Sequence, residues 1–382
     1  MIWVIPEQNH QAMPRAMHYP APEAFPANLN HYIKLAQSLY QGSQNEEGIA
    51  LLCRAVSIFP LEPMPYLMLA NFYSRVGKRD AAREMLQRAP AIPSAHVKMR
   101  IFHLELLMLL EKNIEHIALD TLKIDPINEL AITKLGQIYR KTNRLDCMVS
   151  LCQAALEQKP EHTTARYQLA VAYTLLGLAN EAKQVINLEQ FISQTNIAPT
   201  VDYTTAEVFE DALVDEIMRV PTLKPDPIYK ATINGLQTDI LFPEGAENPL
   251  KILMKQLRAA VERVITQTAV GWQPNRMQLN AWAVVYPENG RQRAHFHPGA
   301  WLSGVYYVSV PKNNSDDPQR GNLVLGVLEL DDHSIDSPWG IKHIKPTAGA
   351  MVLFPSYFPH ATIPTQSNEA RICVAFNVVP VY

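Results

Sequence analysis

The sequence is poor in cysteine, in net charge and in long apolar segments. Four cysteines in 382 residues, with no Cys-x-x-Cys pair, give no disulfide framework of the kind found in small secreted domains. A formal net charge of -3 offers no basic surface for nucleic acid or an anionic membrane. No apolar run approaches the roughly 20 residues that span a bilayer, and no signal-peptide pattern opens the sequence. We therefore expect a cytoplasmic protein with reduced thiols that binds neither nucleic acid nor membrane.

What is present indicates an ordinary globular protein. Hydrophobic residues make up 47% and charged residues 19% of the chain, a composition too apolar for intrinsic disorder. At roughly 150 residues per domain, the length predicts two domains with cores of their own. The hydrophobic period is about 3.6 in the first half and 2 beyond residue 272, so we expect helices followed by strands.

A period of 34 residues runs through the first half. Its marker is a leucine followed at once by a small residue, at Leu35-Ala36, Leu69-Ala70, Leu135-Gly136 and Leu169-Ala170. The same period spaces three prolines, Pro60, Pro126 and Pro160. Ile101 fills the missing place between the second and third leucines if two residues are deleted near Pro90–Pro93. Such a period predicts stacked helical hairpins, because one hairpin cannot bury its apolar face alone.

These segments resemble tetratricopeptide repeats. In the segment from Pro126 to Lys159 the matching residues are Leu135, Gly136, Tyr139, Ala155 and Pro160. The resemblance implies an N-terminal α-solenoid of four or five units with an imperfect third. Such arrays often hold a peptide in their groove, but many serve as a dimer interface or a spacer. A protein or peptide partner and a homodimer are therefore both open alternatives.

A proline-rich stretch without repeat phase follows at residues 190–230. We place a domain boundary near 195, which divides the chain into an N-terminal segment (1–29), a repeat domain (30–195) and a second domain (196–382). Within the second domain, residues 249–266 predict one amphipathic helix. Five strands are predicted beyond it, at 276–286, 302–310, 322–330, 350–354 and 370–379. Antiparallel strands of this length predict a sandwich or jelly roll, whose two sheets can enclose a site.

The leading candidate for a site is His295-Phe296-His297. The period of two directs both imidazoles to the same side of an extended chain, so that both could bind one metal ion. Such a short motif is weak evidence when it stands alone. His360, which follows a predicted strand, could supply a third imidazole.

An arginine stands inside the last, otherwise apolar strand. Alternation places Arg371 on one side of this strand with Cys373, Ala375 and Asn377. A guanidinium that faces the interior is costly unless an anion meets it, and its fork matches a carboxylate. The alternative is an exposed arginine on an edge strand.

Residues 276–379 resemble the iron(II)- and 2-oxoglutarate-dependent oxygenases. The resemblance is carried by three segments: Tyr286-Pro287-Glu288-Asn289-Gly290 before the histidine motif, Ser303-Gly304-Val305-Tyr306-Tyr307-Val308, and Arg371-Ile372-Cys373-Val374-Ala375-Phe376-Asn377. The first is similar to prolyl hydroxylases, and the others to a bacterial and phage branch of the family. The resemblance implies a double-stranded β-helix (jelly roll) that uses iron(II), 2-oxoglutarate and O₂, with ascorbate supporting activity in vitro.

The resemblance also implies roles for single residues. His295 and His360 would be iron ligands, and Arg371 would bind the distal carboxylate of 2-oxoglutarate. Tyr286 and Tyr307, together with Asn377, are expected at the cosubstrate; the alternative for the tyrosines is a place in the aromatic core.

The sequence departs from the family at one ligand. The common motif is His-x-Asp/Glu, whereas the third residue here is His297. Either three neutral imidazoles hold the metal, which we favour, or His297 is no ligand and water or halide takes its place. A remote carboxylate from Asp316 or Asp317 is a further alternative.

The expected activity is that of an oxidoreductase, a dioxygenase that hydroxylates a protein or peptide presented by the repeats. Aspartyl hydroxylases show a similar pairing of helical repeats with an oxygenase domain. One alternative is a catalytically silent repeat scaffold whose barrel binds metal or a small acid, which the exchange of a carboxylate for His297 favours. Another is a hydroxylase of a small metabolite. We expect His333 and His343 to be unrelated loop residues.

Overall fold

The computed structural model describes residues 2–3, 28–41, 44–189, 192–197, 203–227, 230–241, 248–267, 273–312, 317–331 and 333–381. The chain divides into two compact units, one of residues 8–144 and the other of residues 1–7 and 145–382. Most of the N-terminal segment predicted at 1–29 lies outside the described residues. Within the described residues, no helix has the length and apolar character that crossing a bilayer requires.

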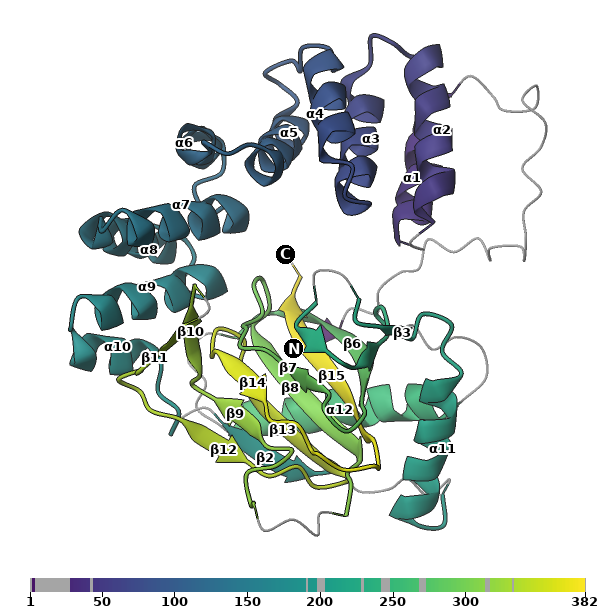
Figure 1. Ribbon diagram of the computed structural model, residues 1–382, viewed down its shortest axis with the longest axis vertical. Helices are drawn as coiled ribbons and strands as arrows, with labels where there is room; N and C mark the ends of the chain where they lie inside the picture. The colour runs from purple at the N-terminus through teal and green to yellow at the C-terminus, as the bar shows by residue number, and fades with distance from the viewer. Residues whose placement is uncertain are drawn as a thin grey trace. The chain divides into compact units, whose positions relative to one another are not determined.

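The first half of the chain is helical, as its period predicts (Figure 1). The helices are α1 (Leu29–Gln41), α2 (Asn45–Ile58), α3 (Pro63–Arg75), α4 (Arg79–Arg88), α5 (Val97–Leu110), α6 (Glu115–Ile124), α7 (Glu129–Lys141), α8 (Leu145–Gln158), α9 (Thr163–Leu175) and α10 (Ala179–Val185). Ile101 lies in α5, where the period places the third, imperfect unit. The predicted tetratricopeptide-like α-solenoid is thus confirmed.

The small residues of the repeat sit where helices approach closely. Ala36, Ala70 and Ala170 are fully buried, because a larger side chain there would push neighbouring helices apart. Pro60 and Pro160 follow the ends of α2 and α8, since proline lacks the N–H group that would continue a helix.

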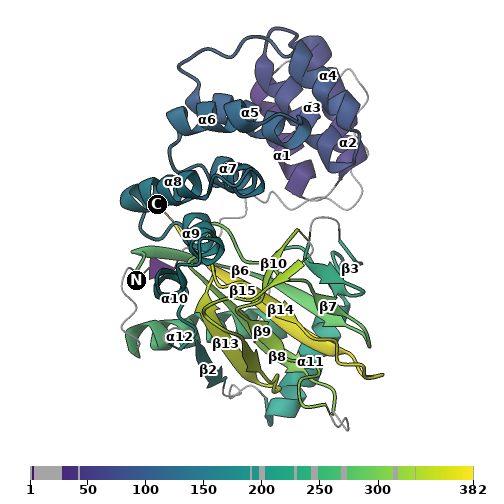
Figure 2. The same ribbon diagram turned by 60° about the vertical axis from the view of Figure 1, so that its left-hand side comes forward.

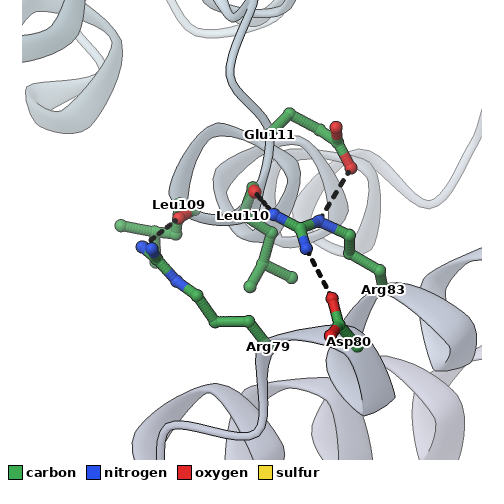
Figure 3. Close-up of polar contacts among 6 residues, drawn as sticks. All are labelled: Arg79, Asp80, Arg83, Leu109, Leu110 and Glu111. Carbon is green, nitrogen blue, oxygen red and sulfur yellow. Dashed lines mark hydrogen bonds and ion pairs between the residues drawn. The ribbon is translucent and has the colours of Figure 1, made fainter.

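Arginines of α4 satisfy the free carbonyl groups at the end of α5 (Figure 3). Arg83 donates to the carbonyl of Leu110 at 2.6 Å, and Arg79 donates to the carbonyl of Leu109 at 3.3 Å. Arg83 also pairs with Asp80 at 2.8 Å. The last carbonyl groups of a helix have no partner within it, and cations near them are favourable. These contacts join the second hairpin to the third.

The second unit is built on a large sheet. Its path runs β2-β13-β8-β15-β6-β5-β3, with β1 paired to β6. The strands are β1 (Ile2–Trp3), β2 (Ser193–Asn196), β3 (Lys224–Pro225), β5 (Leu236–Gln237), β6 (Arg276–Tyr286), β8 (Leu302–Ser309), β13 (Ala350–Pro355) and β15 (Arg371–Pro380). The central strands β6, β15, β8 and β13 are antiparallel to one another and carry the core, whereas β1 runs parallel to β6.

A small sheet faces the large one and completes the jelly roll. It has the order β12 (Lys342–Ile344), β9 (Leu323–Leu325) and β14 (His360–Thr362). Two short pairs, β4 (Thr232–Ile233) with β7 (Arg291–Gln292) and β10 (Leu328–Leu330) with β11 (His333–Ile335), extend the unit. The helices α11 (Ala206–Met218) and α12 (Pro249–Gln267) share one apolar cluster with the large sheet, and Figure 2 shows them from a second side.

The strand at 322–330 is interrupted, contrary to expectation. It divides into β9 and β10 at Gly326, whose φ is +91°. A Cβ atom at this position would lie 2.3 Å from the carbonyl oxygen of Gly340, so only glycine fits. The backbone turns here, and the two parts join different sheets.

Two segments expected to be irregular contain regular structure. The predicted loop at 331–349 includes β11 and β12, so His333 and His343 lie on strands rather than in a loop, although both are exposed. In the proline-rich stretch, α11 begins after Thr205, whose hydroxyl accepts a hydrogen bond from the amide of Val208 at 3.3 Å. Such an N-cap is a sequence signal that the proline density obscured.

The last hairpin of the solenoid, α9 with α10, belongs to the same compact unit as the sheets. The division between residues 144 and 145 therefore precedes the end of the repeat pattern. The boundary near 195 marks the change of pattern in the sequence, and as a domain boundary it stays a prediction.

We predict that Gly48→Ala destabilises the repeats. Alanine in a helix normally stabilises by about 0.5–1 kcal/mol over glycine. A Cβ atom on Gly48, however, would lie 2.2 Å from a ring carbon of Phe72, which is buried against Tyr40. Overpacking costs about 1–3 kcal/mol, so the free energy of unfolding should fall by about 1–2 kcal/mol.

Urea unfolding followed by helical circular dichroism measures this change. Ser57→Ala is the matched control, because Ser57 lies on the same helix and is exposed. A Gly48→Ala protein as stable as the control or more so would contradict the close approach of α2 and α3.

Candidate metal and anion site

Three histidines from two distant segments meet between the sheets. His295 and His297 follow β7, and His360 is the first residue of β14. The amide of His295 donates to the carbonyl of His360 at 3.0 Å, and the amide of His360 donates back at 2.8 Å. The amide of His297 donates to the carbonyl of Ser356 at 2.9 Å. One nitrogen from each imidazole lies within 4.8 Å of the other two.

Backbone carbonyls orient two of the rings. The Nδ1 atom of His295 lies 2.9 Å from the carbonyl oxygen of Arg293, and Nδ1 of His360 lies 3.0 Å from that of Phe358. Because a carbonyl only accepts, each Nδ1 carries the proton, and each Nε2 keeps a free lone pair. This is the common arrangement of a metal-binding histidine.

The three rings are neutral. Burial lowers the pKa of His295 to about 4 and holds the pKa of His297 and of His360 well below the ordinary value. No carboxylate joins this cluster among the residues that the structure describes, so Asp317 is not part of it; Asp316 lies outside them. Three neutral imidazoles are a donor set that suits a divalent transition metal.

The guanidinium of Arg371 is buried among neutral groups of the described structure. The side chain is 1% exposed, and its Nη1 atom donates to the carbonyl of Gly321. Its central carbon lies 4.5 Å from the centre of the Tyr286 ring. Nε and Nη2 are buried and make no hydrogen bond within the described part of the chain. Because a buried cation with free donors is costly, the position fits a bound acid.

Histidines and arginine face one narrow cavity. It is lined by His297, His360, Tyr286, Tyr307, Arg371 and Cys373, among others. The alternation of β15 produces this arrangement, since Ile372, Val374, Phe376 and Val378 lie in the apolar cluster on the other side. The site thus brings together imidazoles that could bind a metal ion and a guanidinium that could bind an anion.

The remaining groups of the cavity are neutral donors. Burial holds the pKa of Tyr286 and of Tyr307 well above the usual range. Burial also raises the pKa of the Cys373 thiol to about 11. Both phenols can therefore donate hydrogen bonds near neutral pH, and no described side chain of the cavity adds a negative charge.

Other side chains near the histidines divide between cavity and core. Trp282 lines the cavity, and its ring lies 5.6 Å from that of His297. Trp301 belongs to the apolar core. Asn377 contacts His297 rather than Arg371, with its side-chain nitrogen 3.4 Å from Nδ1.

Sequence reasoning missed the hydroxyls of Ser303 and Ser356. Their Oγ atoms lie 2.8 Å apart, and Ser303 also lies 2.8 Å from Oδ1 of Asn377. The signal available in the sequence was Ser303, a hydroxyl-bearing residue within the largely apolar segment that forms β8.

Helix α9 packs on the loop that carries His295 and His297. The Tyr167 ring stacks on Phe296, with ring centres 4.2 Å apart and planes at 21°. The hydroxyl of Thr163 donates to the carbonyl of Ala300 at 2.9 Å in a buried contact. Phe296 stands between the two histidines, so the helix orders the segment on which both lie.

The same face of α9 contacts the turn before His360. The guanidinium of Arg166 lies 5.5 Å from the centre of the Tyr357 ring. Thr163, Arg166 and Tyr167 are three and four residues apart and share one helical face. The last repeat hairpin is therefore part of the wall that supports the site.

Part of the chain matches a known family model. Residues 280–377 match the family model described as "Putative 2OG-Fe(II) oxygenase", and this segment holds the three histidines and Arg371. A search of the curated proteins finds no match.

Solved structures similar to the chain fall into two groups. One is a Pseudomonas putida prolyl-4-hydroxylase, 18% identical over 55% of this chain and 100% of that one, with a TM-score of 0.34. The other includes YrrB, a tetratricopeptide protein with an unusual peptide-binding site (19% identity, 42% and 87% coverage, TM-score 0.34), and MamA (16%, 41% and 87%, TM-score 0.35).

The three neutral histidines predict a pH dependence for the metal-free protein. Their pKa values are lower in the folded than in the unfolded state, so between about pH 6.5 and 4 the unfolded chain binds more protons. Stability should therefore be complete above pH 6.5 and fall with pH, by up to about 1.4 kcal/mol per pH unit for each histidine.

Melting temperatures between pH 4 and 8, with and without bound zinc, test this expectation. The triple substitution of His295, His297 and His360 by glutamine should reduce the fall of the melting temperature below about pH 6.5. If the melting temperature of that variant falls as steeply with pH, other groups cause the acid sensitivity.

Proposed function

We propose that the C-terminal domain is an iron(II)- and 2-oxoglutarate-dependent dioxygenase that hydroxylates a protein or peptide side chain. The observation that carries this proposal is the buried guanidinium of Arg371, whose Nε and Nη2 have no partner among the described residues and which lines the same cavity as His297 and His360, two of the three convergent imidazoles. A ligand that binds both Arg371 and a metal ion on the imidazoles must carry a carboxylate at one end and a metal-chelating group at the other. 2-Oxoglutarate has both, and the family match over residues 280–377 supports this choice.

His295, His297 and His360 would hold the iron. Bound iron(II) supplies the oxidative chemistry, in which O₂ and 2-oxoglutarate give succinate, CO₂ and a hydroxylated substrate. Three neutral imidazoles leave the full positive charge of the ion in the cavity, where the usual carboxylate ligand would offset part of it. We infer that this charge strengthens the binding of an anionic cosubstrate and weakens the affinity for free metal.

The protein's own groups bind and orient the cosubstrate. Arg371 would pair with the distal carboxylate through Nε and Nη2, whose hydrogens have no acceptor in the described part of the chain. The phenols of Tyr286 and Tyr307 would donate further hydrogen bonds. Trp282 forms an apolar wall beside His297 and excludes water.

A polypeptide substrate is favoured by the helical repeats. Their last hairpin is in direct contact with both histidine-bearing segments through Tyr167 and Arg166. A polypeptide bound to this hairpin, which lies in the same compact unit as the sheets, would therefore lie beside the segments that carry the histidines. A homodimer through the repeats and a cytoplasmic location stay predictions of the sequence.

Turnover tests the proposed activity. Purified protein is incubated with iron(II), ascorbate, 2-oxoglutarate and a peptide library, and succinate is measured against the His360→Ala variant. Succinate above this control, with peptides that gain 16 Da, is the expected result. Succinate without peptide modification, but with a modified metabolite, would identify a small-molecule hydroxylase. Tight metal binding without succinate would identify a silent scaffold.

Arg371→Ala should abolish 2-oxoglutarate binding and leave the metal content nearly unchanged. The reason is that Arg371 lies on β15, whereas the proposed metal ligands lie after β7 and at the start of β14. Calorimetry with the zinc-loaded protein measures cosubstrate binding, and elemental analysis measures metal. Arg276→Ala, at an exposed arginine on β6, is the control. Equal loss of metal and 2-oxoglutarate would mean that Arg371 is structural.

A further inference from the structure

A histidine can bind a metal through Nε2 only when its proton resides on Nδ1. For His295 and His360, backbone carbonyls impose this tautomer. His297 differs from both, because the group beside its Nδ1 is the side-chain amide of Asn377, at 3.4 Å. An amide can donate or accept, depending on which of its two ends faces the ring.

The two orientations of this amide have opposite consequences. With the amide nitrogen toward the ring, which is the orientation in the structure, Asn377 donates to Nδ1, and the proton of His297 lies on Nε2. The Nε2 atom of His297 is 3.2 Å from Nε2 of His360, so the proton on His297 would occupy the place that a metal ion needs. With the amide oxygen toward the ring, Nδ1–H donates to Oδ1, and Nε2 is free for the metal.

Ser303 can satisfy the far end of the amide in either orientation. Its hydroxyl lies 2.8 Å from Oδ1 of Asn377 and 2.8 Å from the hydroxyl of Ser356. Because a hydroxyl both donates and accepts, Ser303 can donate to the amide oxygen or accept from the amide nitrogen. Ser303 and Ser356 are almost completely buried, so water does not compete for these bonds.

Backbone structure holds this chain of groups in place. Asn377 on β15 lies directly opposite Ser303 on β8 in the strand register. Ser356 follows β13 and is bound to His297 through the backbone. The amide is thus presented to His297 from rigid strands, as a group that orients a ligand must be.

We propose that Asn377 is the positioning residue of His297 and selects the tautomer that can bind metal. This inference rests on the proposed metal site. A neutral third ligand without a carboxylate needs a partner at Nδ1, and the Ser356–Ser303–Asn377 chain provides one. Metal binding favours the orientation with the amide oxygen toward His297.

Cobalt(II) affinity of the full-length protein tests the proposal, by competition with a chromogenic chelator. Asn377→Ala should weaken binding roughly 10–100-fold, the usual effect of losing a partner of a ligand histidine. Asn377→Asp should stay within about tenfold of the unchanged protein, because its carboxylate accepts from Nδ1–H. Ring ¹⁵N NMR of the zinc-loaded protein should place the His297 proton on Nδ1.

Asn280→Ala is the matched control. Asn280 is an amide opposite Asn377 in the β6–β15 register, and its side-chain oxygen accepts a bond from Gln278. Its cobalt affinity should be unchanged, and melting temperatures of the metal-free variants exclude misfolding. Asn377→Ala with unchanged affinity, or Asn377→Asp as weak as Asn377→Ala, would overturn the proposal. If the unchanged protein does not bind cobalt, both the metal site and this proposal are wrong. If it binds cobalt but forms no succinate, only the proposed activity is wrong.

Discussion

Two reciprocal backbone hydrogen bonds between His295 and His360 hold the site together. They join a loop after β7 to the first residue of β14, across 65 positions of sequence. Because the bonds involve main-chain atoms, the approach of the two segments does not depend on a bound ion. The side chains then converge in a cavity where desolvation keeps them neutral. A preformed, neutral set of nitrogen ligands follows from sheet pairing and burial together.

The cavity carries a positive charge, and this charge determines which ligands it can bind. Arg371 is a fixed cation, and the described lining residues include no carboxylate to balance it. A metal held by three imidazoles would add two further positive charges. Such a cavity is costly when empty and favourable for a dianion, so metal and dicarboxylate should strengthen each other's binding. The imidazole of His297, if it takes the place of a carboxylate ligand, would make the site still more positive.

The helical hairpin and the jelly roll share one packing surface at the site. Tyr167 on α9 stacks on Phe296, the residue between His295 and His297, and Arg166 packs on Tyr357, which precedes His360. A repeat that could have served as a spacer therefore stabilises the histidine segments. This contact gives the repeats a structural role in the site, apart from any role in holding a substrate.

The helical repeats, the helix at 249–266, the main strands and the candidate histidines with Arg371 could all be predicted from the sequence, because periodicity and alternation are local properties. The break at Gly326 could not, since a close contact with the backbone of Gly340 decides it, and the strands within 331–349 could not, since they depend on pairing with β10 and β9. The helix α11 was missed although its N-cap, Thr205, is visible in the sequence. Alternation also placed Asn377 beside Arg371 on one face, but only the structure brought it to His297 and Ser303. Strand register and the approach of distant segments are set by tertiary packing, and a linear pattern does not contain them.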